Sequence, residues 1–96
     1  MIRVLLVDDQ PLIRTGFKTI LETEPGIEVV GEASDGTRGV ELALELRPDV
    51  VCMDVQMPRM NGIEATRELT SRGCGSAVLI LTTFDRDDFL FETLQA

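Results

Sequence analysis

Apolar and polar residues alternate along this chain in two different periods. Short apolar runs occupy residues 2–7, 27–32, 50–53 and 77–81, and each run is too short for a helix. Because these runs are rich in Val, Ile and Leu, we expect strands that are buried on both faces of a sheet. Between them lie segments of about ten residues in which apolar positions recur every three or four residues. The pattern predicts four strand–helix pairs.

Residues that favour helix ends mark the first two helical segments. Pro11 suits the first position of a helix, and Pro25-Gly26 closes that segment. The apolar stripe of this helix comprises Ile13, Phe17, Ile20 and Leu21. Ser34-Asp35-Gly36 predicts a turn and the start of a second helix, which stops before Pro48. Its apolar positions are Val40, Ala43, Leu44 and Leu46.

The third and fourth helices also have recognisable starts. Asn61 and Glu64 have the spacing of a capping box, and the helix that they open should run to about Ser71. Asp85 can cap a fourth helix. The apolar side of that helix comprises Phe89, Leu90 and Leu94.

Regular alternation of strands and helices predicts the architecture. Strands separated by helices pair in parallel through right-handed crossovers, with helices on both faces of the sheet. At 96 residues the chain is long enough for one domain and too short for two. We therefore expect residues 1–96 to form one α/β domain with a doubly wound parallel sheet.

Composition removes several classes of function. The chain has 9 basic and 17 acidic residues, a net charge of -8, which argues against direct binding of nucleic acid. It has no His, so His-based triads and imidazole metal ligands are excluded. Cys52 is expected in the core and Cys74 in a loop, as in a reducing compartment. The apolar start is too short for a signal peptide or a membrane span, so we expect a cytoplasmic protein.

Polar residues follow three of the predicted strands. Asp8 and Asp9 come after the first, Asp54 after the third and Thr82 after the fourth. Ligands of parallel sheets bind outside the carboxyl ends of the strands. If the first and third strands are neighbours, the three carboxylates converge, and two charges about 4 Å apart repel by roughly 4 kcal/mol at an effective dielectric near 20. A hard divalent cation such as Mg²⁺ would relieve this repulsion.

Each of these residues also has a purely structural interpretation. Asp8-Asp9 could cap the first helix, and Asp54 could begin a turn. Thr82 could be an ordinary β-branched strand residue. Three methionines are interpreted as packing rather than as a cofactor site: Met53, Met57 and Met60. The shared position at one edge of one sheet favours a functional site.

The chain resembles the receiver domain of bacterial two-component response regulators. The residues that carry the resemblance are Val4-Leu5-Leu6-Val7-Asp8-Asp9, the run from Asp54 to Gly62, and Leu79-Ile80-Leu81-Thr82-Thr83. The segments Gln10 to Gly16 and Glu32-Ala33-Ser34-Asp35-Gly36 look most like the NarL/FixJ (LuxR-type) subfamily. Regulators of that kind carry a C-terminal helix-turn-helix that binds DNA, and this chain contains none.

The resemblance implies a role for each site residue. Asp54 would be the phosphoacceptor, taking a phosphoryl group from the phosphohistidine of a sensor histidine kinase. Asp9 would bind Mg²⁺ directly, Asp8 would help through water, and Gln56 would offer its backbone carbonyl. Thr82 would hydrogen-bond the phosphoryl group as a switch residue.

The resemblance also implies a flavodoxin-like, CheY-like sheet of order 2-1-3-4-5, of which this chain holds the first four strands. A fifth strand ending in a Lys, and a fifth helix, are expected to be missing after Ala96. We therefore expect weakened phosphoacceptance. A strand left as a sheet edge invites another chain, so self-association by edge pairing or helix exchange is expected.

Two other functions compete with the phosphoacceptor. A metal-dependent phosphohydrolase with an Asp nucleophile would need a second Asp two residues later, and that position is Gln56. We therefore do not expect a turnover enzyme. The second alternative is a receiver-like interaction module that works without phosphorylation. The complete set of acidic residues argues against it.

Overall fold

The structure is a computed structural model that describes residues 1–81. Its strands are β1 (Ile2–Val7), β2 (Ile27–Ala33), β3 (Val50–Asp54) and β4 (Ala77–Leu81). Its helices are α1 (Pro11–Glu22), α2 (Gly36–Leu46) and α3 (Gly62–Ser71). The predicted strands and the first three helices are confirmed, with β2 and β3 each one residue longer than expected. The predicted helix that starts at Asp85 lies outside the described residues.

The four strands form one parallel sheet in the order β2-β1-β3-β4. This confirms the expected α/β fold and the expected strand order. β1 therefore lies between β2 and β3, and the register places Val7 beside both Ala33 and Met53. The carboxyl ends of β1 and β3 are neighbours, which is the condition for the acidic residues to meet.

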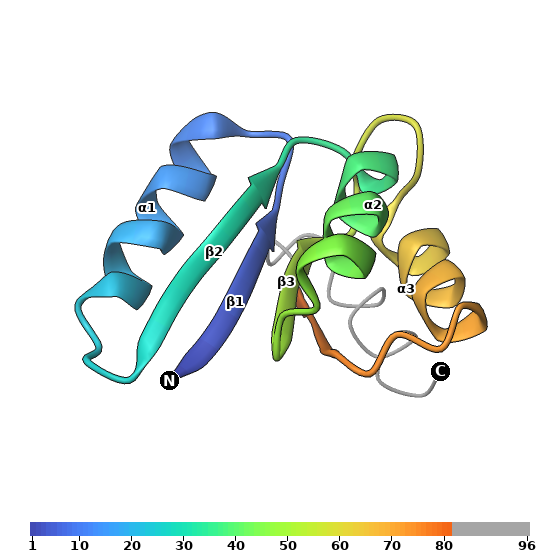
Figure 1. Ribbon diagram of the computed structural model, residues 1–96. Helices are drawn as coiled ribbons and strands as arrows, with labels where there is room; N and C mark the ends of the chain where they lie inside the picture. The colour runs from blue at the N-terminus through green and yellow to red at the C-terminus, as the bar shows by residue number, and fades with distance from the viewer. Residues whose placement is uncertain (82–96) are drawn as a thin grey trace.

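Alternate residues of the strands bury opposite faces of the sheet. Leu5 and Val7 of β1 point into the larger core, which α2 and α3 cover, whereas Val4 and Leu6 point into a smaller core beneath α1. Figure 1 shows α1 on one side of the sheet and α2 and α3 on the other. The period of two along β1 is thus the reason that both faces need helices.

The apolar stripe of α1 is wider than the surface that it buries within residues 1–81. Phe17 and Leu21 pack against the smaller core, as predicted. Ile13 is 44% exposed and Ile20 is 64% exposed, and neither belongs to that core. The stripe correctly predicted a helix, but only half of it faces the sheet in the described structure.

The predicted starts of α2 and α3 are confirmed by their caps. The Asp35 carboxylate accepts a hydrogen bond from the Arg38 amide at 2.8 Å. The Asn61 side chain accepts from the Glu64 amide at 2.8 Å, and the Glu64 carboxylate accepts from the Asn61 amide at 3.0 Å. Each cap satisfies amides that the helix itself leaves without partners.

Both cysteines are free thiols in the described structure. Cys52 is buried in the smaller core, where burial raises the pKa of its thiol. Cys74 lies in the connection between α3 and β4 and is partly buried against the larger core. In residues 1–81 no helix has the length and apolar character needed to cross a membrane.

Candidate metal and phosphoryl site

Asp8 follows β1 directly and is held in place by its backbone. Its amide donates to the Ala33 carbonyl at 3.0 Å, which continues the pairing of β1 with β2. One carboxylate oxygen accepts from the Gln10 amide at 2.8 Å, and the residue is only 8% exposed. Asp8 is therefore a buried carboxylate in a fixed turn.

Asp54 is the last residue of β3 and is equally buried, with 8% of its surface exposed. The Val55 amide donates to its carboxylate at 2.8 Å. Asp8, exposed Asp9 and Asp54 each offer an oxygen, and these oxygens all lie within 4.8 Å of one another. The convergence predicted from the strand ends is confirmed. The structural alternative, in which Asp8-Asp9 only caps α1, is not supported, because the residue before α1 is Gln10 and makes no side-chain cap.

The surroundings of Asp8 disfavour its ionised form. Burial raises the pKa of the Asp8 carboxyl above its ordinary value, and the nearby Asp9 charge raises that pKa further. The hydrogen bond from the Gln10 amide and the Arg14 guanidinium act in the opposite direction, and burial prevails. Three acids held this close, two of them buried, form a site that favours a cation.

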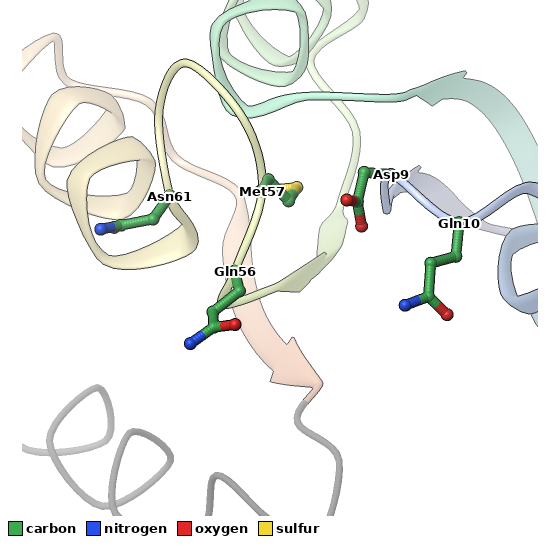
Figure 2. Close-up of a pocket in the computed structure, with 5 residues that line it drawn as sticks. All are labelled: Asp9, Gln10, Gln56, Met57 and Asn61. Carbon is green, nitrogen blue, oxygen red and sulfur yellow. The ribbon is translucent and has the colours of Figure 1, made fainter.

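An open pocket of about 410 Å³ lies beside the cluster, between the β1–α1 turn and the β3–α3 loop. Its lining residues are Asp9, Gln10, Gln56, Met57 and Asn61. Figure 2 shows the Met57 side chain directed toward Asp9, whereas the Asn61 side chain turns away from it to cap α3. Sequence reasoning interpreted Met57 as packing. It does touch the larger core, but it also forms one wall of the pocket.

Arg14 is a contributor that sequence reasoning did not single out. From the first turn of α1 its guanidinium donates to the Asp8 carbonyl at 2.6 Å and to the Glu32 carboxylate at 3.1 Å. The Arg14 side chain is only 19% exposed. It thereby ties together α1, β2 and the turn that carries the acids. A signal was present in the sequence, since Arg14 adjoins the apolar stripe of α1 and Glu32 lies in the second strand.

The donor set fits Mg²⁺. Every candidate ligand is an oxygen, the acids are close enough to share one ion, and the pocket is open enough for water to complete the shell. Gln56 lines the same pocket, as its proposed role requires. Thr82, the predicted phosphoryl-binding residue, lies outside the described residues.

A family comparison agrees with this geometry. The model of the response regulator receiver domain matches residues 4–96. The chain belongs to the response regulator receiver family. This confirms the resemblance seen in the sequence, and it places the receiver domain in two-component regulation rather than among turnover enzymes.

The receiver domain is similar to one part of several longer regulatory proteins. It is 48% identical over 96 residues to the transcriptional regulatory protein LiaR of Bacillus subtilis, covering 100% of this chain and 46% of that protein. It is 45% identical over 96 residues to the response regulator GacA of Pseudomonas aeruginosa, covering 100% of this chain and 45% of that protein. The receiver domain thus spans about half the length of these curated relatives.

Solved structures share the fold. The response regulator domain of Thermotoga maritima CheB superposes with a TM-score of 0.91 at 38% identity, covering 99% of this chain and 72% of that one. The signal receiver domain of the putative response regulator NarL from Mycobacterium tuberculosis gives a TM-score of 0.91 at 34% identity, covering 98% of this chain and 76% of that one.

Proposed function

We propose that this receiver domain accepts a phosphoryl group on Asp54 from the phosphohistidine of a sensor histidine kinase. The observation that carries the proposal is the cluster of three carboxylates within 4.8 Å at the ends of β1 and β3. Asp54 is the member that ends β3, and the loop that follows it carries Gln56 and Met57, which line the adjacent pocket.

The transfer would balance as follows. An Asp54 carboxylate oxygen forms a bond to phosphorus while the phosphorus–nitrogen bond of the phosphohistidine breaks. The electron pair of that bond leaves with the imidazole nitrogen, which is then protonated. Positioning and electrostatic stabilisation supply most of the catalysis in reactions of this kind.

We further propose a role for each surrounding residue. Asp9 is the exposed acid of the cluster and would ligate Mg²⁺ directly, while buried Asp8 would help through water and Gln56 would offer its backbone carbonyl. When bound, Mg²⁺ supplies positive charge against the negative charge that builds on the transferring group. Thr82 would hydrogen-bond the phosphoryl group.

A third part of the proposal concerns the whole protein. We propose that phosphorylation of this domain controls a DNA-binding output domain elsewhere in the protein. Support comes from LiaR, which is named a transcriptional regulatory protein and of which this chain covers 46%. The net charge of -8 makes the receiver domain itself a poor surface for DNA. Self-association along β4 stays a prediction, which light scattering at micromolar concentration tests.

Phosphoacceptance is tested by incubating the protein with Mg²⁺ and acetyl phosphate, followed by intact mass spectrometry and borohydride trapping of the acyl phosphate. One phosphoryl group on Asp54 is expected, and none in Asp54→Ala. Asp49→Asn is the matched control, because Asp49 precedes β3 at the opposite end of the strands from the acidic cluster. Its carboxylate accepts a hydrogen bond from the Arg3 amide at 2.8 Å. Label on Asp9 or Asp49, or no label at all, would contradict the proposal and favour a phosphate-independent interaction module.

Metal binding is tested separately by titration calorimetry with Mg²⁺. Binding is expected in the wild type, with Asp9→Ala the variant that weakens it most, because Asp9 is the solvent-facing acid of the cluster. Unchanged affinity in Asp9→Ala would refute its assignment as a direct ligand.

A further inference from the structure

The loop between β3 and α3 contains a tight turn that no residue of the loop itself explains. The Met60 amide donates to the Pro58 carbonyl at 2.8 Å, which closes a three-residue turn around Arg59. Arg59 has a φ of 72°, a value that is strained for any residue with a side chain. A conformation of this kind persists only when its surroundings hold it.

The start of α2 is the neighbour that holds this turn. A Cβ atom on Gly36 would overlap the Met60 carbonyl oxygen and would lie 2.9 Å from the Met60 Cβ. The backbone of α2 therefore lies directly against the backbone of the loop, which only Gly permits. Figure 1 shows the loop arching beside the first turn of α2. This contact joins segments that are 24 residues apart in the numbering of the chain.

Asp35 strengthens the same junction. One oxygen of its carboxylate caps α2 through the Arg38 amide at 2.8 Å, and the other lies 3.6 Å from the Arg59 guanidinium. The Asp35 side chain is 12% exposed, whereas the Arg59 side chain is 73% exposed. The cap therefore fixes where α2 begins, and the ion pair adds a weaker tie to the strained residue.

The opposite end of the loop is fixed to β3. The Gly62 amide donates to the Val55 carbonyl at 2.7 Å, and a Cβ on Gly62 would overlap the Asp54 carbonyl oxygen. With its base closed in this way, the loop is supported further along by the contact of Met57 and Met60 with the larger core and by the backbone contact between Met60 and the start of α2. Gln56 and Met57, which line the pocket beside the acids, lie in this loop.

We infer that Asp35 and Gly36 are positioning residues for the phosphoryl site: the first turn of α2 sets the conformation of the β3–α3 loop and so the placement of Gln56 and Met57. Neither residue lines the pocket or belongs to the acidic cluster. The effect on metal binding rests on the proposed function, because it assumes that Mg²⁺ binds beside Gln56.

Two variants test the inference, each with a matched partner. Gly36→Ala is expected to weaken Mg²⁺ binding about tenfold. This is the lower end of the loss of metal affinity caused by mutating residues that support metal ligands. The φ of Gly36 is not positive, so Ala tests the contact and not the backbone conformation. Its control is Gly16→Ala in α1, where an added Cβ meets nothing within 4 Å. That variant should bind Mg²⁺ within twofold of the wild type.

The second pair separates positioning from charge. Asp35→Ala removes the cap and is expected to weaken Mg²⁺ binding severalfold, whereas Asp35→Asn can still cap α2 and should restore affinity to within twofold of wild type. Val29→Ala destabilises the smaller core on the opposite face of the sheet. It should leave Mg²⁺ affinity unchanged, which would exclude general loss of stability as the cause.

A metal-free readout keeps the inference distinguishable from the proposed function. In the apo proteins the amide resonances of Gln56 and Met57 should shift in Gly36→Ala and Asp35→Ala but not in Val29→Ala. Absence of Mg²⁺ binding in the wild type would refute the metal site. The amide resonances of Gln56 and Met57 in the apo variants would still test the positioning role. Folded Gly36→Ala with wild-type affinity and unshifted resonances would overturn the inference. If Gly36→Ala does not fold, the two Asp35 variants decide it in the same way.

Discussion

Removing one charge from the acidic cluster should make the metal-free protein more stable. Asp8→Asn keeps the shape of the side chain and an oxygen that can accept from the Gln10 amide, now 2.8 Å away. Charges on oxygens no more than 4.8 Å apart repel by at least about 3 kcal/mol at an effective dielectric of 20 and by about 1 kcal/mol in water. Because Asp9 is exposed, we expect a net gain of about 2 kcal/mol at pH 7.

The sign of the pH dependence follows from the raised pKa of Asp8. A carboxyl whose pKa is higher in the folded than in the unfolded protein favours folding in its protonated form. That contribution is complete below the unfolded pKa, near 4, and is lost as the pH rises through the folded pKa. The advantage of Asp8→Asn over wild type should therefore be largest at pH 7 and should shrink as the pH is lowered toward about 4.

Urea unfolding followed by far-ultraviolet circular dichroism measures this gain, since the chain has no Trp or Tyr for fluorescence. In EDTA at pH 7, the unfolding midpoint of Asp8→Asn should lie at a higher urea concentration than that of wild type. Mg²⁺ at tenfold its dissociation constant should stabilise wild type by about 1.4 kcal/mol. The difference in stability between Asp8→Asn and wild type should therefore become smaller. Asp49→Asn, outside the cluster, should change stability by less than about 0.5 kcal/mol. Equal or lower stability of Asp8→Asn in EDTA would refute the view that like charges strain this site.

Three further predictions concern stability and are checked by the same urea unfolding. Asn61→Ala should lower the free energy of unfolding by about 1 kcal/mol through loss of the α3 cap, and an unchanged midpoint would contradict this. Arg47→Gly should raise the free energy of unfolding by less than about 1 kcal/mol, because Arg47, the C-cap of α2, has a φ of 49° that Gly adopts without strain. A lower free energy of unfolding would show that the Arg47 side chain itself stabilises the fold. Arg14→Gln should cost about 1–2 kcal/mol, because it breaks the half-buried links to the Asp8 carbonyl and Glu32. Lys18→Gln, whose exposed pair with Glu32 is 3.5 Å long, should cost less than about 0.5 kcal/mol, so equal losses would count against the Arg14 assignment.

The local structure of this domain could be predicted from sequence because its causes are local. Apolar runs such as 77–81 are too short for a helix, and Asn61 with Glu64 marks a helix start by spacing alone. The same patterns place Asp8, Asp9 and Asp54 at strand ends. They do not order the strands, so the meeting of these acids was conditional until the family resemblance supplied the order 2-1-3-4 and the structure confirmed it.

Tertiary structure decided the features that depend on contacts between distant segments. Only the pairing of β1 with β3 brings the buried carboxylates within 4.8 Å, and only the docking of α1 brings Arg14 to the Asp8 carbonyl. The position of Gly36 in the sequence indicates a turn, but its close approach to Met60 exists only after α2 and the β3–α3 loop pack together. The physical reason is range: periodicity and capping act over a few residues, whereas a site is built where segments tens of residues apart meet across the sheet.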